Sequence, residues 1–286
     1  MTTTGKSTTG KATTGKTTSK ASAPRPVART HGMSSLARAE LTMLLRNRTA
    51  LVNTILVPLA LVAALYMIGQ DSDLGSPTTV MVTSAVVLAM SYVVYYNLVT
   101  TYVARRESYV LKRMRTGTVP DYGILFATAL PSLVLAVLQI IVVVIGAIII
   151  GPIPGFENVV AVLLAVVLGF AVFMMLAAAS VPYTRTAETA QVTTLPVVLI
   201  TMGLSGMFFP LHVLPDALEN VARLTPGASV VELLNIGMQG INRNGEAIFS
   251  FADGVARCLT PTVVLLAWVV VTGWIIKERF TWEPRR

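Results

Sequence analysis

The stretch YGILFATALPSLVLAVLQIIVVVIGAIIIGPIPGF, residues 122–156, contains no charged side chain. A bilayer core about 30 Å thick is crossed by about 20 apolar residues in a helix. This stretch exceeds that length before it reaches GPIPG at 151–155, where two prolines and two glycines end any helix. It therefore predicts a membrane-spanning helix over residues 122–150.

Five further stretches of the chain are apolar, free of charged residues and about long enough to span a bilayer. The chain as a whole is 54% hydrophobic and only 13% charged, with a mean hydropathy of +0.70. Soluble domains carry about 25% charged residues. The composition predicts an all-α integral membrane protein with six transmembrane helices. We expect these helices over 49–69, 78–104, 122–150, 157–181, 189–212 and 259–277.

The basic residues give the orientation of these helices. Nineteen of the 22 Lys and Arg residues fall in the segments that an even helix count places on one side. Cytoplasmic loops carry the excess of Lys and Arg, so both termini, including 281–286, are predicted to be cytoplasmic. The net charge of +8 then reports topology, and nucleic-acid binding is not needed to explain it. The basic N-terminal tail is suited to contact anionic membrane lipid.

The N-terminal region precedes the first apolar run. Residues 1–30 are a Thr/Lys repeat with almost no apolar side chains, which predicts disorder. Within it, GKATTGKT at 10–17 fits the phosphate-loop pattern, but no strand precedes it and no apolar helix follows, so we interpret the match as accidental. Residues 34–48 show an amphipathic pattern that predicts an interfacial helix; the alternative is an inward extension of the first transmembrane helix.

A catalytic function is one possibility that the sequence raises. The segment Gly-Leu-Ser-Gly at 203–206 resembles the nucleophile motif of rhomboid proteases, which would make the chain a membrane-embedded serine hydrolase acting through Ser205. Such a serine needs a His base. On one helix His212 would lie about 10 Å from Ser205, too far for a base. Close helix packing by small residues is the structural interpretation of the same motif, and a passive membrane anchor or assembly protein is the other alternative.

The interiors of the expected helices hold no Asp, Glu, Lys or Arg, since Glu157 and Lys277 stand at helix ends. This argues against a carrier driven by protons or sodium, and a transporter of this composition would take its energy from elsewhere. No set of metal ligands occurs in them at ligand spacing, so we expect no metal, cofactor or catalytic residue in this chain. The single cysteine, Cys258, excludes an intrachain disulfide.

Two segments carry a resemblance to a known family. RRESYVLKRMRTGTVP at 105–120 resembles the basic segment after the second helix of ABC-2 type transporter permeases, although Tyr109 and Val110 stand where that family often has Gly-Thr. SGMFFPLHVLPDALENVARLTP at 205–226 resembles the family's signature at the end of the fifth helix. The matching positions are Ser205, Gly206, Phe209, Pro210, Leu214, Pro215, Leu218, Leu224 and Pro226.

The resemblance implies that about residues 31–280 form an ABC-2 type transmembrane domain. It implies a type V exporter-like fold, with an N-terminal interfacial helix and re-entrant elements between the last two helices. It also implies the permease subunit of a drug or antibiotic exporter in a bacterial plasma membrane. That permease would dimerise with a second copy or a paralogue. It would work with two ATPase subunits, which bind the ATP and Mg²⁺.

The resemblance also implies the site residues. The segment from Arg106 to Arg115 would be a coupling helix seated in the ATPase, and 181–191 a smaller contact. The expected coupling residues are Arg105, Arg106, Glu107, Leu111, Lys112, Arg113 and Arg115. The expected path for an amphipathic substrate is Tyr92, Tyr95, Tyr96, Asn97, Thr100, Thr201, Ser205, Phe208 and Phe209, with an outer gate at Pro210, Pro215 and Pro226. An interfacial tyrosine belt and tight helix packing are the structural alternatives for the path residues.

Overall fold

The computed structural model describes most of the chain beyond residue 75. The described residues are 1–2, 38–39, 42, 52, 56, 59–64, 66–67, 76–116, 119–151, 155–208, 210–241 and 251–283. The expected tail over 1–30, the interfacial helix over 34–48 and the first transmembrane helix over 49–69 lie wholly or largely outside them. These three predictions are not tested by the structure.

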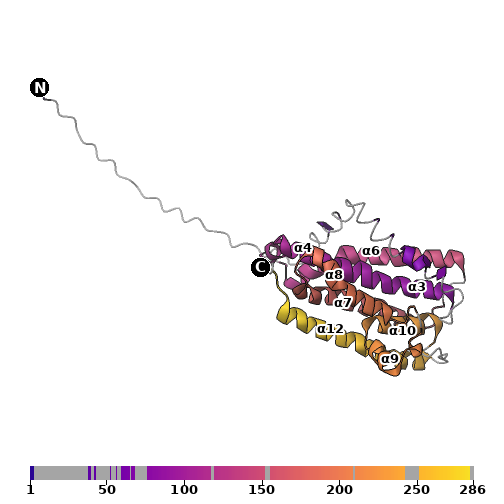
Figure 1. Ribbon diagram of the computed structural model, residues 1–286. Coiled ribbons are helices and arrows are strands. Elements are labelled where there is room, and N and C mark those ends of the chain that lie inside the picture. Colours follow the sequence, from indigo (N-terminus) through magenta and orange to yellow (C-terminus); the bar gives the residue numbers. More distant parts are fainter. Residues whose placement is uncertain are drawn as a thin grey trace.

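Every regular element in the described part of the chain is helical, and the long helices run side by side (Figure 1). The C-terminal end of the chain and α4 lie at one end of the bundle, and α9 and α10 lie toward the other. The elements are α3 (Pro77–Leu88), η2 (Ala89–Tyr96), α4 (Asn97–Glu107), α5 (Val110–Arg115), α6 (Asp121–Ile150), α7 (Val159–Ser180), η3 (Val181–Tyr183), α8 (Ala187–Gly203), η4 (Leu211–Val213), α9 (Asp216–Arg223), α10 (Pro226–Gln239), α11 (Phe251–Arg257) and α12 (Leu259–Arg279).

Four continuous helical segments of the described part are long and apolar enough to cross a membrane. They are Pro77–Glu107, Asp121–Ile150, Val159–Tyr183 and Asp253–Arg279. The predicted class, an all-helical membrane protein, is confirmed. The count of six spans stays a prediction, because the first expected span is largely undescribed and α8 has only 17 residues.

The helix expected over 189–212 is shorter than predicted, because α8 ends at Gly203. Gly206 follows in the left-handed region at φ +81°, where a residue without a Cβ is favoured. Pro210 then takes extended backbone, which a helix interior does not accommodate. The chain therefore leaves the helix after Gly203 and reaches α9 through a turn and the short helix η4.

The continuous segment α3–η2–α4 forms the centre of the bundle. Ser76 caps its N-terminus by accepting a hydrogen bond from the Thr79 N–H, and Pro77 occupies the first turn. The segment contacts α6, α7, α8 and α10, and nearly all of its most apolar portion is buried. This segment also carries many polar side chains, among them Ser84, Ser91 and Asn97. Polar side chains face protein rather than lipid inside a bilayer, so polarity and burial agree here.

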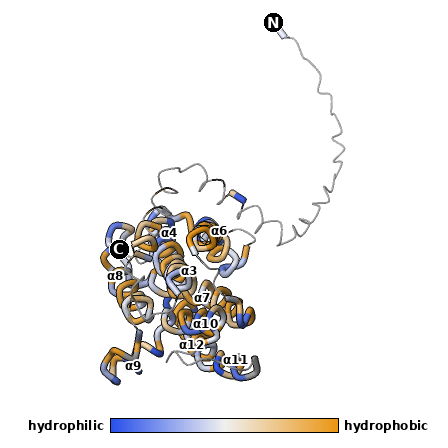
Figure 2. Tube along the Cα trace, turned by 90° about the vertical axis from the view of Figure 1, so that its right-hand side faces the viewer, coloured by the Kyte–Doolittle hydropathy of each residue, from blue (hydrophilic) through white to orange (hydrophobic). Residues whose placement is uncertain are grey.

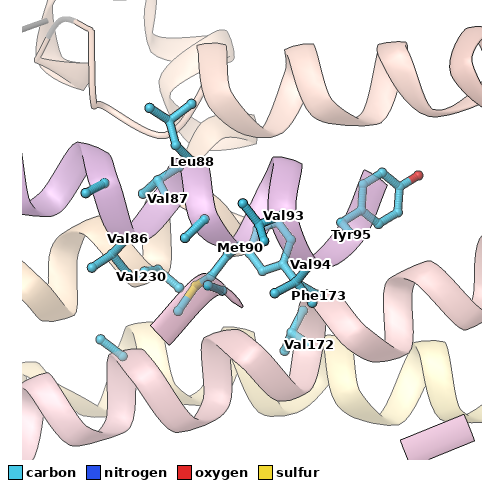
Figure 3. Close-up of a cluster of buried hydrophobic side chains, with 14 of the residues drawn as sticks. Val86, Val87, Leu88, Met90, Val93, Val94, Tyr95, Val172, Phe173 and Val230 are labelled. Atoms are coloured by element: carbon cyan, nitrogen blue, oxygen red, sulfur yellow. The ribbon is translucent and has the colours of Figure 1, made fainter. Parts of the chain in front are cut away.

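On one side of the central segment, the core packing depends on Gly169 of α7. Met90 and Val94 of η2 lie over Val172 and Phe173 of α7 in Figure 3. A Cβ built on Gly169 of α7 would lie 2.7 Å from the Met90 sulfur. The absence of a side chain at Gly169 thus allows the thioether to lie directly on the α7 backbone.

The helices of the bundle consist largely of hydrophobic residues (Figure 2), and many of these are exposed on its outer faces. Large exposed hydrophobic residues lie on α6, α7 and α12; examples are Ile141, Ile145, Ile149, Leu163, Val167, Val263 and Val270. A soluble protein would not expose faces of this kind. They match the surface that a bilayer covers, which supports the membrane assignment.

Candidate functional site

The end of the bundle at which α4 and the C-terminal segment lie is held together by a buried arginine. Arg106, at the end of α4, is fully buried, and its guanidinium donates to the carbonyl oxygens of Val181 at 2.8 Å and Thr184 at 2.5 Å. It also donates to the Arg185 carbonyl at 3.0 Å and lies 3.5 Å from the Thr281 hydroxyl. This arrangement joins α4 to the segment after α7 and to the C-terminal segment.

This burial changes the interpretation of Arg106. We expected it among the residues that contact a partner, but a side chain with no exposed surface is closed to a docking protein. A buried guanidinium needs several acceptors, and backbone carbonyls at the ends of helical segments supply them. Arg106 therefore positions the loops that follow α4 and α7, and its side chain is not available for contact with a partner.

Glu107 connects the same two inner loops from the outside. Its carboxylate is exposed and accepts a hydrogen bond from the Ala187 N–H, 3.2 Å away, in the first turn of α8. A carboxylate at a helix N-terminus is favoured by the helix dipole. Glu107 thus links the α4–α5 turn with α8 while remaining open to a partner.

The turn between α4 and α5 depends on Tyr109. This residue adopts φ +57° and ψ +13°, the left-handed conformation that favours glycine. It is the position at which the sequence departs from the Gly-Thr of the resembling family. The left-handed residue interrupts the helix, so that α4 ends at Glu107 and α5 begins as a separate helix at Val110.

Helix α5 combines an exposed basic surface with one buried apolar side chain. Leu111 is fully buried, whereas the side chains of Lys112, Arg113 and Arg115 are exposed. Lys112 pairs with Glu283 at 2.7 Å, and this hydrogen-bonded carboxylate raises the pKa of the Lys112 ammonium. Arg115 pairs with Asp121 at 3.2 Å.

The C-terminal segment therefore lies against α5, a contact that sequence reasoning missed. Besides the Glu283 pair, the Arg115 guanidinium lies 5.2 Å from the centre of the Trp282 ring, and Phe280 packs edge-on against that ring at 4.9 Å. The remaining predicted coupling residue, Arg105, is half-buried and donates to the Thr128 hydroxyl of α6 at 3.2 Å. It points into the bundle.

The tyrosines expected to line a path lie in a π-helix, η2, which no sequence signal indicated. The rings of Tyr92 and Tyr96 stack with their centres 5.1 Å apart and are half-buried, as are Asn97 and Thr100. Tyr95 lies apart from them: it is buried, and its hydroxyl is 3.1 Å from that of Ser180 on α7. The structure thus groups four of the five expected residues and places Tyr95 in the core.

The path residues expected near the end of α8 do not form a group. Phe209 lies outside the described residues, Phe208 is exposed, and Thr201 and Ser205 are buried. A Cβ on Gly227 would lie 2.6 Å from the Thr201 carbonyl and 3.3 Å from the Ser205 Cβ, so these two residues pack against the start of α10. Close packing explains them better than a lining role does.

Ser205 has the surroundings of a structural serine. Its hydroxyl donates to the Met202 carbonyl at 2.6 Å and accepts from the Met207 N–H at 3.2 Å. Because α8 ends before Ser205, the helical spacing to His212 used above does not apply. The burial of Ser205 and its two backbone partners leave the hydrolase alternative without support.

The three prolines expected at an outer gate each precede or begin a helix. Pro210 comes before η4, Pro215 before α9, and Pro226 occupies the first turn of α10 behind the Thr225 cap. A proline is tolerated in these positions because its missing N–H has no partner in a first turn. The three residues thus set the boundaries of the short helices that follow α8.

A family model described as an ABC-2 family transporter protein matches residues 33–276 of the chain. The chain belongs to the ABC-2 transporter family. No individual curated protein matches the chain. Family membership makes it a transmembrane permease, a transport component of the kind that works with ATP-binding subunits.

Proposed function

We propose that this ABC-2 permease exports an amphipathic small molecule, drug or lipid-like compound with energy from ATP hydrolysed by two separate ATPase subunits. The observation that carries the proposal is the geometry of α5, where exposed cations stand on the fully buried Leu111 at one end of the bundle. A short helix fixed in this way moves as a unit with the helices behind it.

The route for a mechanical signal follows from the contacts around Arg106. A displacement of α5 passes through the turn at Tyr109 into α4 and thus into the central segment. Arg106 and Glu107 carry the same displacement to the segment before α8 through hydrogen bonds of 2.5–3.2 Å. One docking event at the inner face would then move two membrane helices together.

The half-buried face of Tyr92, Tyr96, Asn97 and Thr100 is the proposed contact for substrate. Stacked phenol rings and neutral hydrogen-bonding groups suit an amphipathic molecule without requiring a fixed charge. The central segment contains no charged residue from Pro77 to Ala104. The absence of charge there supports an energy source in another subunit.

We further propose that the permease is a dimer in a bacterial plasma membrane. The distribution of the basic residues supports the placement of both termini in the cytoplasm.

The proposal is tested with the permease and a cassette ATPase encoded beside it, co-expressed and reconstituted in liposomes. We expect vanadate-sensitive ATPase activity that is stimulated by the permease. Glu107→Arg places a cation against the N-terminus of α8 and should uncouple hydrolysis from export, whereas Glu107→Gln retains an acceptor for the Ala187 N–H. If the permease alone hydrolysed ATP, or if Glu107→Arg exported normally, the proposed coupling would be wrong.

A further inference from the structure

A small polar cavity lies between the first turns of α3, the turn after α8 and the helix α10. It has a volume of about 30 Å³ and is lined by Val80, Thr83, Ser84, Gly206, Met207, Val231, Asn235 and Gln239. About 30 Å of helix separates Ser84 from Arg106 at about 1.5 Å per residue, so the cavity lies at the end of the bundle opposite α5. Under the proposed orientation this is the outer end.

Two hydroxyl groups of the lining residues have no hydrogen-bond partner among the described residues: those of Thr83 and Ser84. These residues are only 5% and 1% exposed. Many other hydroxyls in the described helices bond to the carbonyl one turn earlier, as Thr101 does to Asn97 at 2.8 Å, although those of Ser91 and Thr262 also lack a partner. A buried hydroxyl without a partner is unfavourable, so a bound molecule that supplies the missing hydrogen bond is favoured at this position.

The chemistry of the lining defines the class of ligand. The two hydroxyls and the carboxamides of Asn235 and Gln239 donate and accept hydrogen bonds. The eight lining residues carry no ionisable side chain. A charged group would therefore find no counter-ion, whereas a neutral hydroxyl or amide would find partners on two sides. The volume suits about two water molecules or one such group.

We propose that this cavity is a neutral hydrogen-bonding subsite at the outer end of the protomer. Water occupies it at rest, and an uncharged hydroxyl or amide group of the exported molecule occupies it during exit. The second part of this statement rests on the proposed function; the first part does not. The subsite is distinct from the stacked tyrosines of η2, which lie nearer the middle of the central segment.

The test uses the full chain in membrane vesicles with Cys258→Ser, so that an introduced thiol is the sole one. Ser84→Cys is treated with 2-hydroxyethyl methanethiosulfonate and with its anionic 2-sulfonatoethyl analogue, and labelling is followed by mass spectrometry. Ala85→Cys is the matched control, because Ala85 is the next residue, is fully buried and does not line the cavity. Thr83→Cys repeats the measurement should Ser84→Cys fail to fold.

We expect the hydroxyethyl reagent to label Ser84→Cys at least tenfold faster than Ala85→Cys, and at least tenfold faster than the sulfonate does. Equal rates at the two positions, or equal rates with the two reagents, would overturn the subsite. Ethylene glycol, as a hydroxyl probe, should slow the labelling several-fold, whereas tetramethylammonium chloride should not. Labelling that ethylene glycol leaves unchanged would mean water only and would overturn the ligand assignment. None of these measurements needs an ATPase, so their failure is distinguishable from failure of the proposed function.

Discussion

The guanidinium of Arg106 donates a hydrogen bond of 2.5 Å to the carbonyl oxygen of Thr184, a residue 78 positions later in the chain. Both residues are almost fully buried, with Arg106 at 0% and Thr184 at 1% exposure. The bond joins the end of α4 to the loop between α7 and α8. The positions of the two inner loops are therefore not independent, and one side chain fixes them.

Arg106→Gln should lower the free energy of unfolding by about 3 kcal/mol, because buried carbonyl oxygens lose a charged donor that a shorter amide cannot replace. Thermal or denaturant unfolding of the purified protein in detergent measures the change. Arg113→Gln on α5 is the control: Arg113 is exposed, and we expect a change within about 0.5 kcal/mol. Equal losses in the two variants would contradict the role assigned to Arg106.

Tyr109→Gly should leave the protein as stable as before or raise its stability by about 1 kcal/mol, because a left-handed residue with a side chain carries a steric cost that glycine avoids. Tyr109→Val should lower stability, since a β-branched residue at φ +57° is more strongly disfavoured. Unfolding midpoints of the two variants measure the difference. A valine variant as stable as the glycine variant would show that the turn does not keep this conformation.

Some of these features were accessible from the sequence, and others were not. The charge-free stretch at 122–150 predicts a helix because length and hydropathy alone decide membrane insertion. The basic residues of 105–115 mark the inner loop, but no local pattern separates Arg106, which is buried, from Arg113, which is exposed. That distinction depends on carbonyl groups of residues 181–185, which are remote in sequence.

The central segment shows the same limit. The path residues from Tyr92 to Thr100 were named from the sequence, but the π-helix that stacks Tyr92 on Tyr96 and turns Tyr95 toward Ser180 depends on packing against other helices. The end of α8 was misplaced because the apolar run continues through it. Gly206 and Pro210 were the signals that the helix stops, and apolar length outweighed them in the prediction.

Gly227→Ala should destabilise the protein by about 1–3 kcal/mol, the typical cost of overpacking a tight interior. A Cβ at this position would lie 2.6 Å from the Thr201 carbonyl oxygen, and a backbone atom of α8 cannot rotate away. Gly203→Ala is a matched control, because a Cβ there meets nothing within 4 Å and alanine is the better helix former. Unfolding measurements on both variants test whether α10 packs this closely on the end of α8.

The pair of Lys112 and Glu283 predicts a pH-dependent contact between α5 and the C-terminal segment. The carboxylate raises the pKa of Lys112 above its ordinary value of 10.5, so the pair contributes its full stabilisation below that value. The contribution is lost as the pH rises through the raised pKa, when the ammonium loses its proton. NMR of the isotopically methylated lysines should therefore show Lys112 titrating above 10.5. In Glu283→Gln the pKa of Lys112 should fall back toward 10.5, and an unchanged pKa at Lys112 would show that the C-terminal segment does not lie against α5 in solution.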